Sequence, residues 1–116
     1  MPQNLDKDGL RSKINSYELF FIDIWGVIHN GLQIFEDSIE VLENLKKNNK
    51  EFVLLTNAPR PNSTVIDFLK KIGLKKYYED VYTSGEASLK YLMQNFQNSK
   101  FYHIGPPRDF DLFKRF

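Results

Sequence analysis

The sequence predicts an α/β fold of the Rossmann-like, three-layer kind, built on a parallel sheet. Short apolar runs of strand length alternate along the chain with apolar stripes at helical spacing, which is the pattern of βαβ units. The first run, residues 19–24, is almost continuously apolar, as expected for a strand covered on both faces. Parallel strands joined by crossover helices all end at the same edge of the sheet.

The first half of the chain supplies the first two strands and the helix between them. A weak leading helix is expected within residues 1–16, ahead of the first strand. Asp37 has the position of a helix N-cap, with Glu40 three residues later as its capping-box partner. The apolar run at 52–55 then predicts the second strand.

The second half repeats this alternation. Residues 80–82 predict a short third strand, and Thr83 with Glu86 has capping-box spacing for the helix that follows it. Residues 101–104 predict a fourth strand, and a last helix is expected to begin near Asp109. Several aromatic side chains of these elements are expected in the core, namely Phe20, Phe21, Phe52, Phe96 and Phe101.

At 116 residues the chain is one domain or part of one, with the composition of an ordinary globular protein. The net charge of +1 gives no electrostatic reason to expect nucleic acid or an anionic membrane as a partner. Because the sequence has no cysteine, disulfides are excluded and a cytoplasmic setting is the default expectation. No secretory signal is visible, and the longest apolar stretch is too short to span a bilayer.

Two polar residues that end neighbouring strands form the candidate site. Asp23 closes the first strand just before a glycine-bearing loop, and Thr56 closes the second. Ligands of open parallel sheets bind at the carboxyl ends of the strands. A carboxylate there can attack a phosphoryl group, while a divalent cation neutralises charge and a hydroxyl holds the phosphate oxygens. We therefore predict a phosphate site, with Asp23 as nucleophile and Thr56 as donor.

The segments around both residues resemble class IIA of the haloacid dehalogenase (HAD) superfamily. Residues 21–27, Phe-Ile-Asp-Ile-Trp-Gly-Val, are similar to its first motif, an apolar strand ending in Asp-x-Asp-Gly. Residues 54–57, Leu-Leu-Thr-Asn, are similar to its second motif, and residues 82–87 also match the class. The resemblance runs from about Tyr17 to Gly105, which is nearly the whole chain.

This resemblance implies a HAD-like hydrolase of phosphatase type that acts on a small phosphorylated metabolite through an aspartyl intermediate. Asp23 matches the nucleophile, which also ligates Mg²⁺ through its side chain. Trp25 stands where the family has its second aspartate, a position that offers its backbone carbonyl to the metal. Thr56 matches the phosphate-binding hydroxyl. Gly26 and Asn57 are expected to approach or shape the phosphate site.

Trp25 departs from the family pattern. In the family the side chain at this position is the general acid/base, whereas an indole has one N–H donor and no carboxyl group. General acid/base catalysis contributes about 10²–10⁴-fold, so phosphatase activity should fall by that order unless another group substitutes. His29 is one candidate substitute. The more common situation, which we expect here, is a histidine that is simply exposed in a loop.

The family's third and fourth motifs, a lysine and an acidic pair, have no counterpart in this sequence. We therefore expect residues 1–16 to form an N-terminal segment and residues 17–116 to form the N-terminal half of a truncated HAD-like core, without its cap or C-terminal half. With Asp23 and one carbonyl alone, Mg²⁺ would be held weakly. This chain alone is expected to be inactive or impaired, and an unpaired sheet edge to favour self-association.

Two other readings stay open. The chain is alternatively a non-catalytic remnant or interaction module that no longer turns over. A phosphoacceptor receiver domain also has Asp at one strand end and Thr at another. Such domains place an acidic pair on their first strand and need a late lysine, and this sequence shows neither.

Overall fold

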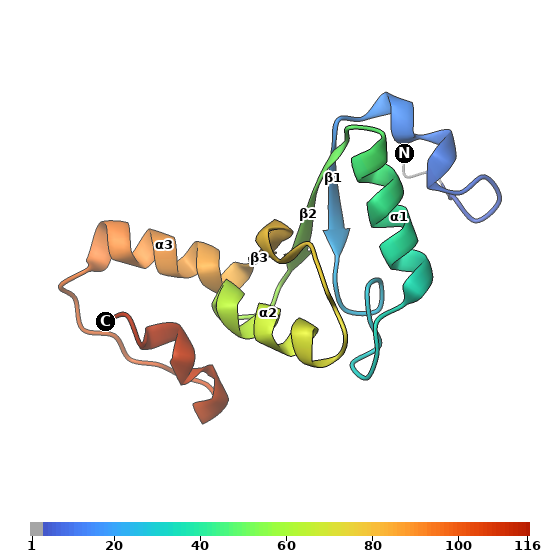
Figure 1. Ribbon diagram of the computed structural model, residues 1–116. Coiled ribbons are helices and arrows are strands. Elements are labelled where there is room, and N and C mark those ends of the chain that lie inside the picture. The colour runs from blue at the N-terminus through green and yellow to red at the C-terminus, as the bar shows by residue number, and fades with distance from the viewer. Residues whose placement is uncertain (1–3) are drawn as a thin grey trace.

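The computed structural model describes residues 4–116 and forms the Rossmann-like α/β fold that the sequence predicts. Three parallel strands make one sheet in the order β1-β2-β3. One helix connects each pair of successive strands, and a third helix leaves the end of β3 and extends away from the sheet (Figure 1). The bounds are β1 Leu19–Asp23, α1 Glu36–Lys47, β2 Glu51–Thr56, α2 Asn62–Lys71, β3 Val81–Thr83 and α3 Ser84–Phe96.

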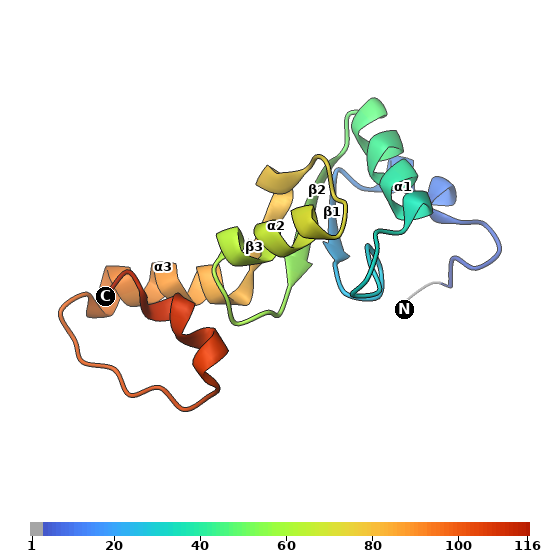
Figure 2. The same ribbon diagram turned by 60° about the horizontal axis from the view of Figure 1, so that its bottom comes forward.

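Helices α1 and α2 cover one face of the sheet (Figure 2). The central strand β2 turns Phe52 and Leu54 toward them, and both side chains are almost completely buried. Between strands and helices lies one apolar cluster, which consists of Ile24, Ile28, Leu42, Leu45, Phe52, Leu54, Leu69, Leu74 and Val81. The alternation of side chains along a strand therefore commits every second residue of β2 to this core.

The opposite face of the sheet is open. Phe21 is 68% exposed and Leu55 42%, whereas Phe20 next to Phe21 is partly buried. Phe21 has Val53 as its partner across the ladder. The prediction that the first strand is covered on both faces is wrong for the described residues. Two successive crossovers in the same direction place both helices on the same side of a parallel sheet.

The N-terminal segment does not form the predicted leading helix. Its described part makes two short 3₁₀ turns instead, η1 (Leu10–Ser12) and η2 (Ile14–Ser16), while residues 1–3 lie outside the described residues. Leu10 and Ile14 still pack against the core cluster. Two apolar side chains give too little tertiary packing to stabilise a longer helix. A short helix gains too little from its own hydrogen bonds to form without such packing.

The starts of the helices differ in how they are capped. Phe35 is the N-cap of α1 and makes no side-chain hydrogen bond, so the prediction of Asp37 as N-cap is wrong and Asp37 lies in the first turn. At α3 the prediction is confirmed, because Thr83 Oγ1 accepts the backbone N–H of Glu86 at 2.9 Å. Asp37 nevertheless lies where its charge suits the helix dipole.

The C-terminal part departs most from the predictions. Residues 101–104 form no strand, and Tyr102 and Ile104 are about nine-tenths exposed. A 3₁₀ helix, η4 (Pro107–Phe113), begins two residues before Asp109 and contacts α3. Among the five aromatics expected in the core, Phe52 is buried and Phe20 half-buried, whereas Phe21, Phe96 and Phe101 are exposed.

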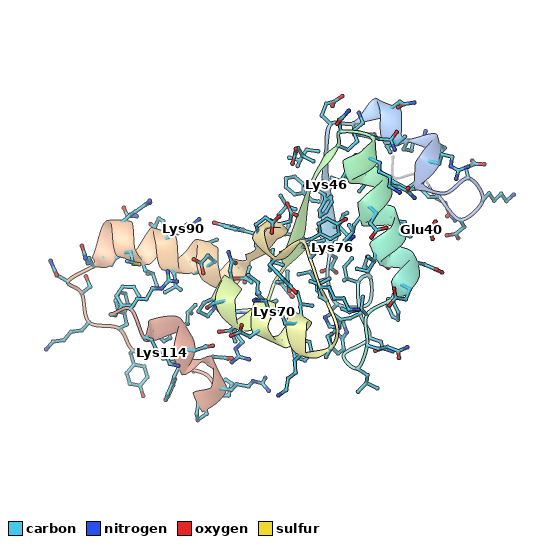
Figure 3. The ribbon with its side chains drawn as sticks, in the orientation of Figure 1. Glu40, Lys46, Lys70, Lys76, Lys90 and Lys114 are labelled. Carbon is cyan, nitrogen blue, oxygen red and sulfur yellow. The ribbon has the colours of Figure 1, made fainter. Side chains whose placement is uncertain are left out.

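The five lysines labelled in Figure 3 lie on different parts of the chain, from α1 to the C-terminal segment. Some lysines lie over aromatic rings, as Lys46 does over Phe52 with its Nζ 4.4 Å from the ring centroid. Among residues 4–116, the helices are all too short or too polar to cross a membrane.

Leu54→Ala should destabilise the chain by about 2–5 kcal/mol, because it leaves a cavity at a side chain with no exposed surface. Urea unfolding followed by circular dichroism measures this loss. Leu32→Ala, at a side chain that is 83% exposed, is the matched control and should stay within about 0.5 kcal/mol of the parent. Equal effects of the two substitutions would contradict the proposed position of the core.

Candidate active site

The candidate site is a hollow of about 360 Å³ at the carboxyl end of the sheet. Asp23 ends β1 on the open face, and its Oδ1 accepts the backbone N–H of Ile24 at 2.8 Å. The other carboxylate oxygen has no protein partner among the hydrogen bonds of the described residues, so it can meet a ligand. The hollow is lined by Phe21, Asp23, Leu55, Thr56 and Asn57.

Thr56 and Asn57 form the rim of this hollow at the end of β2. The ladder pairs Asp23 with Leu55, so Thr56 lies one residue further on and alternation turns it toward the helix side of the rim. Thr56 Oγ1 accepts the N–H of Ala58 at 3.2 Å, which leaves the hydroxyl hydrogen free to donate. A ligand that contacts both Asp23 and Thr56 must therefore lie across the end of β2.

The loop after β1 is held by its backbone and by two buried isoleucines. Ile24 and Ile28 are almost fully buried, and the N–H of Gly26 donates to the carbonyl of His29 at 2.8 Å. Gly26 has a φ of +78°, a conformation that other residues adopt at a cost. This loop carries the Trp25–Gly26 backbone, which follows Asp23 at the carboxyl end of β1.

Trp25 packs on its own loop. A Cβ added at Gly31 would lie 2.5 Å from the indole ring, so the side chain rests directly on the glycine. The imidazole of His29 meets the indole edge-on at a centroid distance of 5.1 Å. The indole remains 64% exposed, and Trp25 is not among the residues that line the hollow.

His29 is buried, which corrects the reading of an exposed loop histidine. Only 3% of it is accessible, and its ring lies between Trp25 and Phe68 of α2. Its Nδ1 accepts the N–H of Gly31 at 2.8 Å, which places the proton of the neutral ring on Nε2. Burial lowers the pKa of His29, because the charged imidazolium is harder to desolvate.

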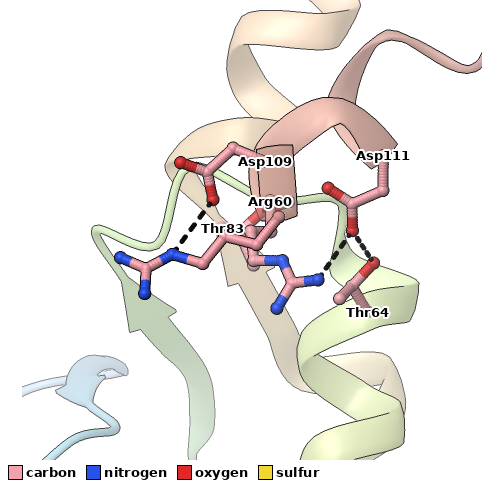
Figure 4. A network of polar contacts seen from close by, with 6 residues as sticks. Arg60, Thr64, Thr83, Asp109 and Asp111 are labelled. Carbon is pink, nitrogen blue, oxygen red and sulfur yellow. Dashed lines mark hydrogen bonds and ion pairs between the residues drawn. The ribbon is translucent and has the colours of Figure 1, made fainter. Parts of the chain in front are cut away.

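A polar network fixes the loop that follows Thr56 and Asn57 (Figure 4). Asp111 of η4 accepts hydrogen bonds from Arg60 at 3.1 Å and from Thr64 of α2 at 2.7 Å. Burial by itself would raise the pKa of Asp111, but these hydrogen bonds and the charge of Arg60 outweigh it and hold the pKa below its usual value. The sequence motifs did not indicate Thr64 or Asp111, because contacts across 47 to 51 residues leave no local pattern.

The same loop is also tied to the start of α3. The Thr83 hydroxyl donates to the carbonyl of Arg60, and the Ser84 hydroxyl donates to that of Asn57 at 2.9 Å. A Cβ at Gly85 would lie 2.3 Å from the backbone of Arg60, so only glycine allows this close approach. The rim of the hollow is thus positioned from three elements that are distant in sequence.

The described residues supply only some of the ligands that a Mg²⁺ ion needs. Asp23 has one uncommitted carboxylate oxygen, and the Trp25 carbonyl is the second ligand that the resemblance implies. Within residues 4–116, no three histidine or acidic side chains lie close enough to one another to hold a metal. Mg²⁺ demands octahedral oxygen coordination, so most of its ligands here would be water or phosphate oxygens.

Comparisons with known proteins define the family. A family profile described as haloacid dehalogenase-like hydrolase matches residues 20–116. The chain therefore belongs to the HAD-like hydrolases, as the two motifs indicated. It is 26% identical over 93 residues to the 5′-nucleotidase YutF of Bacillus subtilis (strain 168), a match that covers 79% of this chain and 36% of that protein.

Solved structures show the same fold in longer proteins. A HAD-like hydrolase from Brucella suis 1330 is 28% identical with a TM-score of 0.75, covering 98% of this chain and 40% of that one. The 4-nitrophenylphosphatase of Thermotoga maritima is also 28% identical, with a TM-score of 0.70, covering 86% and 39%. The chain thus spans about two fifths of the length of the relatives it matches. These structures confirm the HAD-like α/β fold.

The lowered pKa of His29 makes the fold sensitive to acid. A folded-state pKa below the unfolded value contributes stability that is present above the unfolded pKa, near 6.5, and is lost as the pH falls through the folded pKa. The free energy of unfolding should therefore fall more steeply below pH 6.5 in the parent than in His29→Asn. Urea unfolding at several pH values measures both slopes, and parallel slopes would refute this role of His29.

Gly31→Ala should destabilise the chain more than Gly26→Ala. Both glycines have positive φ, +89° and +78°, so both substitutions carry a similar backbone cost. Only at Gly31 does the new methyl group meet the indole of Trp25, which must move aside and lose its packing on this loop. Only Gly31→Ala should also shift the fluorescence of this sole tryptophan. Identical stabilities and spectra would show that the indole does not rest on Gly31.

Proposed function

We propose that this chain carries the nucleophile-bearing half of a HAD-like phosphatase that acts on a small phosphorylated metabolite through an aspartyl intermediate. The supporting observation is that Asp23, Thr56 and Asn57 line one hollow at the carboxyl end of the sheet. Two of the similar proteins are a 5′-nucleotidase and a 4-nitrophenylphosphatase by name. A cytoplasmic setting belongs to the same proposal, on the ground that the sequence has no cysteine.

In the proposed reaction the free carboxylate oxygen of Asp23 attacks phosphorus, and the bond to the leaving oxygen breaks. The N–H of Ile24 holds the other carboxylate oxygen and so orients the nucleophile. Thr56 and Asn57 donate hydrogen bonds to the equatorial phosphoryl oxygens. Water then hydrolyses the acyl-phosphate, which releases inorganic phosphate and restores Asp23. Gly26 allows the loop backbone to approach the phosphate.

Proton transfer is the weak step of this proposal. Trp25 has no carboxyl group, and the buried His29 is not among the residues that line the hollow. The leaving oxygen would take its proton from water, at a loss of about 10²–10⁴-fold in rate. Mg²⁺, held by the Asp23 side chain and the Trp25 carbonyl, would neutralise charge on the phosphate. We therefore propose that the chain alone is inactive or impaired.

A non-catalytic interaction module is the second candidate function. The open sheet face favours it, because Leu19, Phe21 and Leu55 expose apolar surface to which a partner protein could bind. The two functions predict different behaviour toward phosphate. A module of this kind has no need to bind it.

Inorganic phosphate with Mg²⁺ should shift the amide resonances of Ile24 and Asn57 in ¹⁵N-labelled chain. Thr56→Val should weaken this response, because it removes the hydroxyl donor but keeps the shape. Ser88→Ala changes an exposed hydroxyl on α3, which only bonds within its own helix, and serves as control. An absence of shifts at the strand ends, with the fold intact, would favour the non-catalytic module.

A further inference from the structure

The first residue of α3 holds the backbone of the loop that follows β2. The Ser84 hydroxyl shares its one proton between two carbonyl oxygens, that of Asn57 at 2.9 Å and that of Ala58 at 3.1 Å. The Ala58 carbonyl also accepts the N–H of Gly85 at 3.1 Å, so it keeps a donor without Ser84. For the Asn57 carbonyl, Ser84 is the one protein donor among the described residues. The Ser84 hydroxyl therefore acts chiefly on the Asn57 carbonyl.

This contact sets the direction of the next N–H group. The peptide unit between Asn57 and Ala58 is planar and trans, so its C=O and N–H point in opposite directions. While α3 holds the carbonyl, the N–H of Ala58 points back toward the end of β2, where it donates to Thr56 Oγ1 at 3.2 Å. One rigid peptide unit thus joins the Ser84 hydroxyl to the Thr56 hydroxyl.

The Thr56 hydroxyl needs this constraint to serve as a donor to phosphate. A threonine side chain can rotate about its Cα–Cβ bond, and its hydroxyl proton can rotate about the C–O bond. When the N–H of Ala58 occupies one lone pair of Oγ1, the oxygen is held in place and its own proton must point elsewhere. That proton is the one that the proposed reaction directs to a phosphoryl oxygen.

We propose that Ser84 is a positioning residue of the phosphate site. Through the Asn57–Ala58 peptide it holds the Thr56 hydroxyl in the orientation that donates to a phosphoryl oxygen. This inference rests on the proposed phosphatase function, because it gives Ser84 a part in the same site. Ser84 is not among the residues that line the hollow, so it acts through the loop and does not touch the ligand.

The surroundings of Ser84 are held by other contacts. Thr83 caps α3, and its hydroxyl donates to the carbonyl of Arg60. Gly85 lies against the Arg60 backbone and donates its N–H to Ala58. Ser84→Ala therefore removes one polar contact and leaves α3 docked on the loop. Its circular dichroism should match that of the parent, so a change in phosphate binding would not reflect loss of the fold.

Phosphate titration of the ¹⁵N-labelled chain in the presence of Mg²⁺ tests the inference. Ser84→Ala should weaken the apparent affinity for inorganic phosphate about 2–10-fold, which is the loss expected from one neutral hydrogen bond. Ser84→Thr keeps the hydroxyl and should bind phosphate as the parent does. Ser88→Ala is the matched control, because it removes a serine hydroxyl that bonds only within α3, and it should also bind as the parent does.

A double-mutant cycle separates positioning from a general structural effect. Thr56→Val removes the hydroxyl through which Ser84 acts, so Ser84→Ala should cause no further loss of phosphate affinity in a Thr56→Val chain. A second readout needs no ligand. Hydrogen exchange at the Ala58 amide should be faster in Ser84→Ala and in Thr56→Val than in the parent, and Ser88→Ala should leave it unchanged.

The outcomes distinguish this inference from the proposed function. A parent chain that binds no phosphate would refute the proposed function and this inference with it, whatever the exchange of the Ala58 amide shows. Phosphate binding that Ser84→Ala leaves unchanged would overturn the inference alone. An equal loss of affinity with and without the Thr56 hydroxyl would overturn it too, because that result shows that Ser84 does not act through Thr56.

Discussion

The packing of β2 against α1 and α2 is the constraint on which the rest of the structure depends. Phe52 and Leu54 must face these helices to enter the core, and side chains alternate along a strand. Leu55 is therefore forced onto the other face, and the ladder places Asp23 beside it. Core packing thus places the Asp23 carboxylate on the open face of the sheet. Because the carboxylate is exposed there, it needs no buried counter-charge.

A second set of contacts positions the rim of the hollow. These contacts join segments that are far apart in the sequence. Arg60 and the residues before it are held by the start of α3 and by Asp111 of η4. Glu86 accepts the N–H of Asn62 and so joins α3 to the start of α2. The loop that carries Asn57 is therefore held in place by tertiary contacts with the start of α3 and with η4.

The sequence predicted well the features that depend on local pattern. The three βα units, the Thr83 cap of α3 and the neighbouring strand ends follow from apolar spacing and capping residues, and all are observed. Prediction from the sequence failed where the burial or pairing of a residue depends on segments that are distant in the sequence. Residues 101–104 have the composition of a strand but no strand pairs with them, and Phe21 is apolar but nothing in the described chain covers it. The burial of His29 likewise depends on Phe68, which is 39 residues away in the sequence.

The contact between Trp25 and His29 has an optical consequence. This indole is the chain's sole tryptophan, and it meets the imidazole edge-on at 5.1 Å. A protonated imidazole withdraws electron density from an excited indole and quenches its emission. The fluorescence of this indole should therefore report the protonation of His29, in the loop that follows β1, without any added label.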